Sequence, residues 1–362
     1  MTPLARILAE RIAIEGPLPV STVMAEALSH PVHGYYMTRE PFGAAGDFTT
    51  APEISQMFGE MLGLWLGAVW ADMGAPSRVI LAELGPGRGT LMADARRGLA
   101  RVPGFPIDAP VHLVETSARL RQRQIETIGA AVVHHDRLDE LPEDAPLLLL
   151  ANEFFDALPI RQFVFTGRGF HERAVGLGAD GELLFGLVPE PADPRLLPAH
   201  ETPAPGAVLE WSPLSMEIAG RLGARLAAQD GAALIVDYGA AHRGFADTLQ
   251  AVAEHRYADV LATLGIADLT AHVNFAHLAE AATAAGASAF GPRDQGALLQ
   301  DLGIGVRAAH LARANPSKAA EVAEAYARLT APERMGSLFK ALALTGRDQP
   351  APPAFPVPED RG

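Results

Sequence analysis

Short apolar runs alternate with amphipathic stretches through the middle of this chain. The runs "RVILAEL", "PVHLVE", "AAVVHHD", "PLLLLAN" and "AALIVDYG" are rich in Leu or in β-branched residues. Helix-like stretches at 90–101 and 117–129 separate the first three runs. Strands that alternate with helices favour right-handed crossovers and therefore a parallel sheet. The pattern predicts an α/β, Rossmann-like sheet with helices on both faces.

The segment before these runs has a helical pattern. Residues 1–75 are predicted to form an N-terminal helical extension. Within it, Thr50 followed by Pro52 and Glu53 is typical of a capping box that opens a long apolar helix. That helix is apolar enough to allow a homodimer.

The segments after the fourth run differ again. Residues 160–210 contain alternating stretches and an Asp180–Gly181 turn, which predict an inserted antiparallel β segment. Beyond Tyr238 the pattern indicates mostly Ala-rich helix and loop. We therefore expect a core at 76–345 that contains the insertion, and a frayed, Pro-rich tail at 346–362.

Composition narrows the class of protein. The chain has 362 residues, 49% of them apolar, and 29 basic against 43 acidic side chains give a formal charge of −14. Such an acidic body repels phosphate backbones, so nucleic acid is not expected as a partner. The absence of cysteine excludes disulfides and thiolate metal sites. We see neither a membrane-spanning apolar run nor the apolar core of a secretory signal, which indicates a cytoplasmic protein without membrane insertion.

A glycine-rich loop follows the first predicted strand and opens a helix. In "AELGPGRGTL" the glycines Gly85, Gly87 and Gly89 let the backbone turn tightly and approach a ligand. The spacing is not that of an ATP-type phosphate loop. Thr90 also stands where the third glycine of a dinucleotide fingerprint would be. The simpler alternative is a tight turn without a ligand.

Acidic residues at the ends of the first three strands suggest which ligand the loop takes. Glu83 stands beside the loop, where a carboxylate suits an ammonium better than a pyrophosphate. Glu115 ends the second strand, where it can accept from both ribose hydroxyls, and Asp136 ends the third, where it can accept from an adenine amino group. S-adenosylmethionine, which has no phosphate, fits this order of groups. Solvated strand ends and a nicotinamide-dependent oxidoreductase remain as alternatives.

The fourth apolar run passes directly into polar residues in "LLLLANEFFDALPI". Because ligands of open parallel sheets bind beyond the carboxyl ends of the strands, Asn152, Glu153 and Asp156 are candidate catalytic residues. Two carboxylates three residues apart can hold a guanidinium, and Phe154 can shield it from water. Alternatively, Asp156 caps a turn and Phe154 belongs to the core.

At these residues the chain resembles a known family. "HPVHGYYMTREPFGAAGDFTTAPE", "ELGPGRGTLMADARR", "HLVETSARLRQRQ", "ANEFFDALPIRQFVF", "EWSP", "ALIVDYG" and "DLTAHVNF" are similar to the MidA family of S-adenosylmethionine-dependent methyltransferases. The mitochondrial member of that family is an arginine methyltransferase that assists assembly of respiratory complex I. The resemblance implies a seven-strand-type core, symmetric dimethylation of an arginine and an acceptor protein such as a complex I subunit.

The resemblance also assigns residues. It places the cofactor loop on Gly85, Gly87 and Gly89 and the ribose acid on Glu115. It implies that "GDFTTAPE", with Asp47, Phe48 and Thr50, forms a lid over cofactor or substrate, whereas capping of a helix is the simpler reading. Asn274 stands where the family is expected to have Asp, which removes a carboxylate.

These observations together predict transfer of a methyl group to an arginine nitrogen of a protein. Glu153 and Asp156 are expected to orient the guanidinium and disperse its charge. A second hypothesis is an assembly chaperone that binds S-adenosylmethionine without essential catalysis. A methyltransferase that acts on another acceptor is a third.

Overall fold

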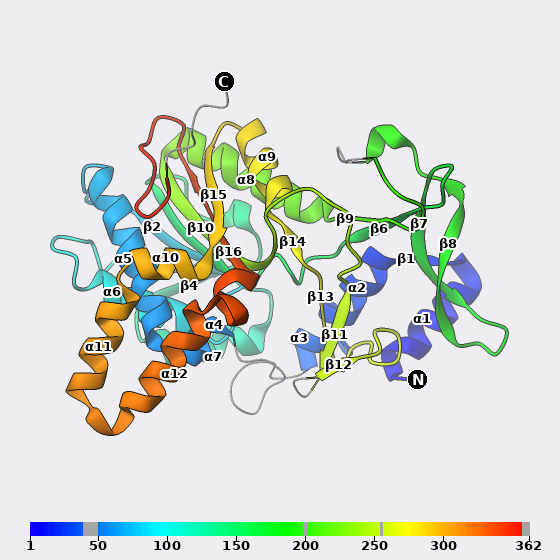
Figure 1. The fold of residues 1–362 in the computed structure, drawn as a ribbon, viewed down its shortest axis with the longest axis horizontal. Coiled ribbons are helices and arrows are strands. Elements are labelled where there is room, and N and C mark those ends of the chain that lie inside the picture. The colour runs from blue at the N-terminus through cyan, green and yellow to red at the C-terminus, as the bar shows by residue number, and fades with distance from the viewer. Residues whose placement is uncertain (39–49, 198–201, 254–255, 357–362) are drawn as a thin grey trace. The chain divides into compact units, whose positions relative to one another are not determined.

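The computed structural model describes residues 1–38, 50–197, 202–253 and 256–356 (Figure 1). The chain divides into two compact units. The auxiliary unit consists of Met1–Phe48, Asp156–Ser215 and His242–Asn274, and the core unit consists of Thr49–Phe155, Met216–Ala241 and Phe275–Gly362.

The core unit is built on one sheet with the strand order β15-β16-β10-β5-β2-β3-β4. All five apolar runs of the sequence form parallel neighbours in this sheet, so the predicted Rossmann-like α/β core is confirmed. The strands are β2 (Ile80–Leu84), β3 (Val111–Val114), β4 (Val132–His135), β5 (Leu147–Asn152), β10 (Gly231–Ala240), β15 (Ser288–Asp294) and β16 (Phe339–Thr345).

The order of the strands locates a crevice. From β2 the chain proceeds outward through β3 to β4, and then returns to place β5 on the other side of β2. The carboxyl ends of β2 and β5 therefore form the switch point at which open α/β sheets bind ligands.

Two strands of this sheet contradict the expectation of mostly helix and loop beyond Tyr238. β16 runs antiparallel between β10 and β15. Its sequence "FKALALT" is rich in good helix formers, so local propensity favours a helix. Pairing on both sides and nearly complete burial override that preference.

Helix α5 (Gln56–Asp72) begins differently from the prediction. Ser55, whose Oγ accepts from the backbone N–H of Met57 at 3.2 Å, is its N-cap. Thr50 instead begins the four-residue α4 (Ala51–Ile54) and makes no capping hydrogen bond with its side chain. The predicted capping box is therefore wrong.

The remaining helices of the core unit connect and flank the strands (Figure 1). They are α6 (Thr90–Leu99), α7 (Ala118–Ile128), α9 (Phe275–Ala284), α10 (Gln295–Asp301), α11 (Ile304–Ala314) and α12 (Ala319–Thr330), together with α8 (Pro213–Gln229) from Met216 onward. Single helical turns lie at Leu138–Glu140, Pro316–Lys318 and Pro332–Gly336. No helix in the described ranges is both long and apolar enough to cross a membrane.

The apolar side chains of α5 are covered within the core unit. Trp65 is fully buried, its indole N–H donates to the carbonyl of Pro353 at 3.0 Å, and its ring meets Phe355 edge-on at 6.4 Å. The tail as far as Phe355 is thus packed, in contrast to the frayed tail that the proline content suggested. The apolar side chains of α5 are therefore used within the core unit, and the homodimer stays a prediction.

The auxiliary unit contains the predicted antiparallel insertion. β6 (Arg161–Phe165), β7 (Phe170–Leu177), β8 (Leu183–Pro191) and β9 (Val208–Trp211) pair with antiparallel register, and β1 (Leu18–Pro19) joins β7. A second sheet consists of β11 (Gln250–Ala253), β12 (Arg256–Ala258) and β13 (Asp268–Thr270). The unit also contains α1 (Pro3–Glu15), α2 (Val20–Ser29), α3 (Tyr35–Thr38), the turn Pro194–Leu196 and β14 (Val273–Asn274).

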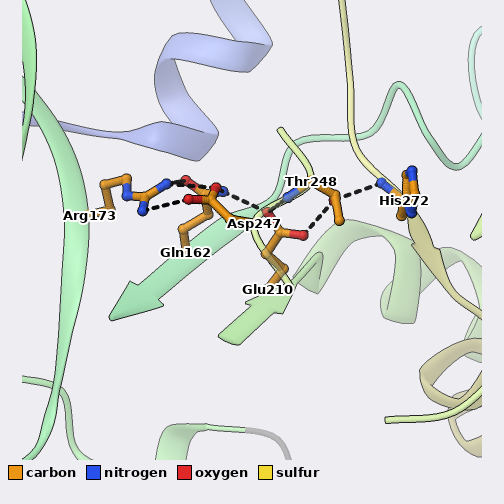
Figure 2. Close-up of polar contacts among 6 residues, drawn as sticks. All are labelled: Gln162, Arg173, Glu210, Asp247, Thr248 and His272. Atoms are coloured by element: carbon orange, nitrogen blue, oxygen red, sulfur yellow. Dashed lines mark hydrogen bonds and ion pairs between the residues drawn. The ribbon is translucent and has the colours of Figure 1, made fainter. Parts of the chain in front are cut away.

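A polar network connects the strands of the auxiliary unit (Figure 2). Glu210 on β9 accepts from Gln162 at 2.6 Å and from the backbone N–H and hydroxyl of Thr248 at 2.9 and 2.5 Å. Arg173 holds Asp247 through two hydrogen bonds of 2.8 and 2.9 Å. Burial raises the pKa of Glu210. Glu210, the glutamate of "EWSP", therefore connects β9 to Gln162 on β6 and to Thr248 within the auxiliary unit.

Candidate active site

The glycine loop lies at the carboxyl end of β2, as predicted. Gly85, Gly87 and Gly89 have φ values of +60°, +51° and +83°, a region that favours glycine. The N–H of Gly85 donates to the carbonyl of Val114 on β3 at 3.1 Å. A Cβ on Gly85 would lie 2.7 Å from Cδ2 of Phe154. The loop is therefore folded tightly, and the end of β5 packs against it.

Glu53 is part of this site, although the sequence suggested only a capping role for it. Its Oε1 accepts from the hydroxyl of Thr90 at 2.6 Å, and its Oε2 lies 3.7 Å from the guanidinium of Arg88. Both partners belong to the glycine loop or the first residue of α6. Glu53 thus secures the loop from α4, a contact across 37 positions that no local pattern reveals.

Glu83 is the buried acid beside the loop. Glu83 is 2% exposed, and its Oε2 has no hydrogen-bond partner among the described residues. Burial raises the pKa of Glu83 from 4.5 to about 8. A cationic ligand group would compensate for the cost of burying the charged form.

We expect Glu83 to make the ligand-free protein less stable as the pH rises from 4.5 to 8. The folded state keeps a proton over this range that the unfolded chain releases, so the free energy of unfolding falls with pH and levels off above 8. Denaturant titrations at pH 5, 6.5 and 8 should show this slope in the wild type and a flatter one in Glu83→Gln. Glu143→Gln, at an exposed position, is the control. Identical slopes in wild type and Glu83→Gln would contradict the assignment.

The acids that follow β3 and β4 differ in their surroundings. Glu115 is half-buried, and its Oε1 accepts from the N–H of Ser117 at 2.7 Å. Burial raises its pKa. Asp136 is exposed and pairs with Arg121 at 2.6 Å. The Glu115 carboxylate is thus held in place, whereas an adenine amino group would have to share Asp136 with the guanidinium of Arg121.

The end of β5 places two candidate catalytic residues together. Oε1 of Glu153 accepts from the amide of Asn152 at 3.1 Å and from the N–H of Ala51 at 3.1 Å. Glu153 has a φ of +50°, a left-handed conformation that a non-glycine residue adopts at a cost of about 1 kcal/mol or more. The backbone therefore reverses at Glu153, directly after the last residue of the strand.

Asp237, at the carboxyl end of the fifth apolar run, fixes this reversal. It is fully buried, and its Oδ2 accepts from the N–H groups of Phe154 and Phe155 at 3.2 and 3.0 Å. Its Oδ1 accepts from the N–H of Tyr238 at 2.9 Å. Asp237 was not predicted as a site residue, although it is an acid at a strand end like Glu115 and Asp136.

The other predicted site residues are not all in the core unit. Asp156 belongs to the auxiliary unit, where its carbonyl accepts from the N–H of Ala271 at 3.0 Å. Thr50 lies at the start of α4, whereas Asp47 and Phe48 lie outside the described residues. Asn274 ends β14. The pairing of Glu153 with Asp156 stays a prediction.

The core unit fits the groups of S-adenosylmethionine. The glycine loop admits no side chain at Gly85, the buried carboxylate of Glu83 suits an ammonium, and Glu115 presents fixed acceptors for hydroxyls. A pyrophosphate would meet the buried acid Glu83 instead of a cation, which disfavours a dinucleotide.

Comparison with known proteins supports this interpretation. Residues 61–293 match the model of an S-adenosyl-L-methionine-dependent methyltransferase family. The chain is 36% identical to "Protein arginine methyltransferase NDUFAF7, mitochondrial" of Danio rerio, over 93% of this chain and 85% of the relative. It is 35% identical to the protein of the same name of Homo sapiens, over 95% of this chain and 83% of the relative.

A solved structure agrees with the whole fold. A crystal structure from Burkholderia thailandensis, bound to S-adenosyl-homocysteine, has a TM-score of 0.84 and 30% identity and covers 97% of this chain and 94% of its own. These findings confirm both the methyltransferase fold and S-adenosylmethionine as the cofactor.

The comparisons also correct the predicted location. The relatives from Danio rerio, Drosophila melanogaster and Homo sapiens are named as mitochondrial proteins, which contradicts the cytoplasmic location expected from the sequence. That prediction was wrong because the lack of a membrane-spanning run and of a secretory signal does not distinguish the cytoplasm from the interior of an organelle.

Proposed function

Because the chain belongs to the MidA family of S-adenosylmethionine-dependent methyltransferases, we propose that it methylates an arginine side chain of an acceptor protein. Relatives at 35–37% identity are named protein arginine methyltransferases, which supports this acceptor. The observation that carries the proposal is the pair Asn152 and Glu153 at the carboxyl end of β5, with Phe154 against the glycine loop.

The residues of the core unit have separate tasks in this proposal. The bound cofactor supplies an activated methyl group, so the protein mainly has to position the acceptor nitrogen and exclude water. Glu153 accepts hydrogen bonds from the guanidinium and disperses its charge, while Asn152 holds the carboxylate. Phe154 limits the access of water to the loop.

Finer points of the proposal rest on the family resemblance or, for Asp156, on its spacing of three residues from Glu153. We propose symmetric dimethylation, a respiratory complex I subunit or another protein as acceptor, and Asp156 as a second acid for the guanidinium. The competing function is an assembly chaperone that binds the cofactor but does not need to transfer the methyl group.

Glu153→Gln tests the proposal, since it keeps the shape of the side chain and an oxygen for the N–H of Ala51. We expect methyl transfer to fall at least about tenfold, equivalent to the loss of about 1.4 kcal/mol of transition-state stabilisation, while the Kd for S-adenosylmethionine changes little. The assay supplies methyl-labelled cofactor and a lysate from cells that lack the enzyme. Mass spectrometry then locates the label.

Four results decide between the alternatives. Label on arginine that falls at least about tenfold with Glu153→Gln but not with Glu143→Gln, at an exposed position, supports the enzyme. Label on another residue type would overturn the acceptor. Full transfer by Glu153→Gln would remove Glu153 from the catalytic role, and a variant that still supports its partner's assembly without transfer would favour the chaperone.

A further inference from the structure

Gln124 is a buried amide on α7 that belongs to no group considered so far. Gln124 is 0% exposed, although the other polar side chains of this helix mostly face solvent. Its Nε2 donates to the carbonyl of Gly87 at 2.8 Å and to Oε2 of Glu115 at 3.3 Å. Its Oε1 lies 2.9 Å from Nε2 of His134 on β4. One side chain thus connects the glycine loop, the end of β3 and the adjacent strand.

These three contacts determine the orientation of the amide. Both hydrogens of Nε2 are directed at acceptors, so Oε1 must accept, and His134 must donate from Nε2. Burial lowers the pKa of His134, which favours the neutral ring, and the contact with Oε1 of Gln124 then places the ring proton on Nε2. A carboxylate at position 124 could donate to neither acceptor and would repel Glu115.

The contact with Gln124 also completes the support of Glu115. Oε1 of that carboxylate accepts from the N–H of Ser117, and Oε2 accepts from Gln124, so both oxygens are fixed. Each oxygen retains a further lone pair for a hydroxyl. A carboxylate that is already oriented before the ligand binds loses less conformational freedom on binding.

We propose that Gln124 is a positioning residue that sets the Glu115 carboxylate against the glycine loop, and that His134 fixes the amide in this role. The selectivity for a ribose diol then depends on Gln124, although this residue need not touch the cofactor. The inference rests on Glu115 as the ribose acid and not on the identity of the methyl acceptor.

The test compares S-adenosylhomocysteine with its 2′-deoxy analogue by calorimetric titration. In the wild type, the hydroxyl that the analogue lacks should contribute about tenfold to affinity. In Gln124→Leu we expect the Kd of S-adenosylhomocysteine to rise about tenfold and that of the analogue to rise less than about threefold, so their ratio approaches one. Gln122→Leu, at an exposed position on the same helix, should keep the wild-type ratio.

The ratio separates positioning from general support of the fold. If Gln124→Leu raises the Kd of both ligands by the same factor, Gln124 only supports the loop. If neither Kd changes, Gln124 neither supports the loop nor positions Glu115. Either result overturns the proposal. If Gln124→Leu does not fold, His134→Leu on the edge strand β4 provides the same comparison. In His134→Leu the ratio of the Kd of the 2′-deoxy analogue to the Kd of S-adenosylhomocysteine should also fall toward one. An unchanged ratio counts against the proposal.

Discussion

Replacing Gly85 with alanine is expected to raise the Kd for S-adenosylmethionine at least about tenfold, which corresponds to about 1.4 kcal/mol. Two effects act together. The φ of +60° places a non-glycine residue in the left-handed region, at a cost of about 1–2 kcal/mol. In addition, the new Cβ would meet Cδ2 of Phe154 at 2.7 Å, so either the loop or the end of β5 must move. Calorimetric titration with the cofactor measures the result.

Gly129→Ala isolates the conformational part of this effect. Gly129 ends α7 with a φ of +63°, but a Cβ there would meet nothing within 4 Å. This variant should lose stability by a similar backbone cost and still bind the cofactor with nearly wild-type affinity. Equal binding by Gly85→Ala and the wild type would mean that the cofactor does not approach this loop closely.

The comparison of sequence with structure shows what local patterns can and cannot predict. The strands β2, β5 and β10 were predictable because strands buried on both faces read as continuous apolar runs. The edge strand β4 is only partly buried and was predictable from its β-branched residues and its place after a helix. The glycine loop was predictable because its backbone conformation restricts the residue type. By contrast, β16 was missed because an Ala- and Leu-rich segment acquires its strand conformation from two flanking strands.

The residues missed in the site share one property. Glu53 contacts Thr90 across 37 positions, Gln124 contacts Gly87 across 37, and Asp237 contacts Phe154 across 83. Each was visible as a polar residue within an apolar or helical pattern, but its partner was not. The sequence therefore indicates which groups are expected to meet the ligand more readily than it indicates the groups that hold them in place.

Asp237 illustrates the energetic weight of such supporting residues. Its carboxylate accepts from three backbone N–H groups and is fully shielded from water. Two of these N–H groups follow the left-handed residue Glu153, where the chain reverses. Without the carboxylate they would be buried donors with no acceptor, and each such donor costs about 1–3 kcal/mol.

We therefore expect Asp237→Ala to lower the free energy of unfolding of the core unit by about 3 kcal/mol and to weaken cofactor binding. Binding is affected because the reversal at Glu153 is what brings Phe154 against Gly85. Asp237→Asn, which keeps one accepting oxygen, should show an intermediate loss of both properties. Denaturant titration with and without S-adenosylhomocysteine measures the two effects.

Asp144→Ala, which removes an exposed carboxylate paired with Arg78, is the control and should leave both the free energy of unfolding and cofactor binding nearly unchanged. Wild-type stability in Asp237→Ala would mean that the backbone at the end of β5 finds other acceptors, and the site would then owe its shape to the packing of Phe154 and Phe155 alone.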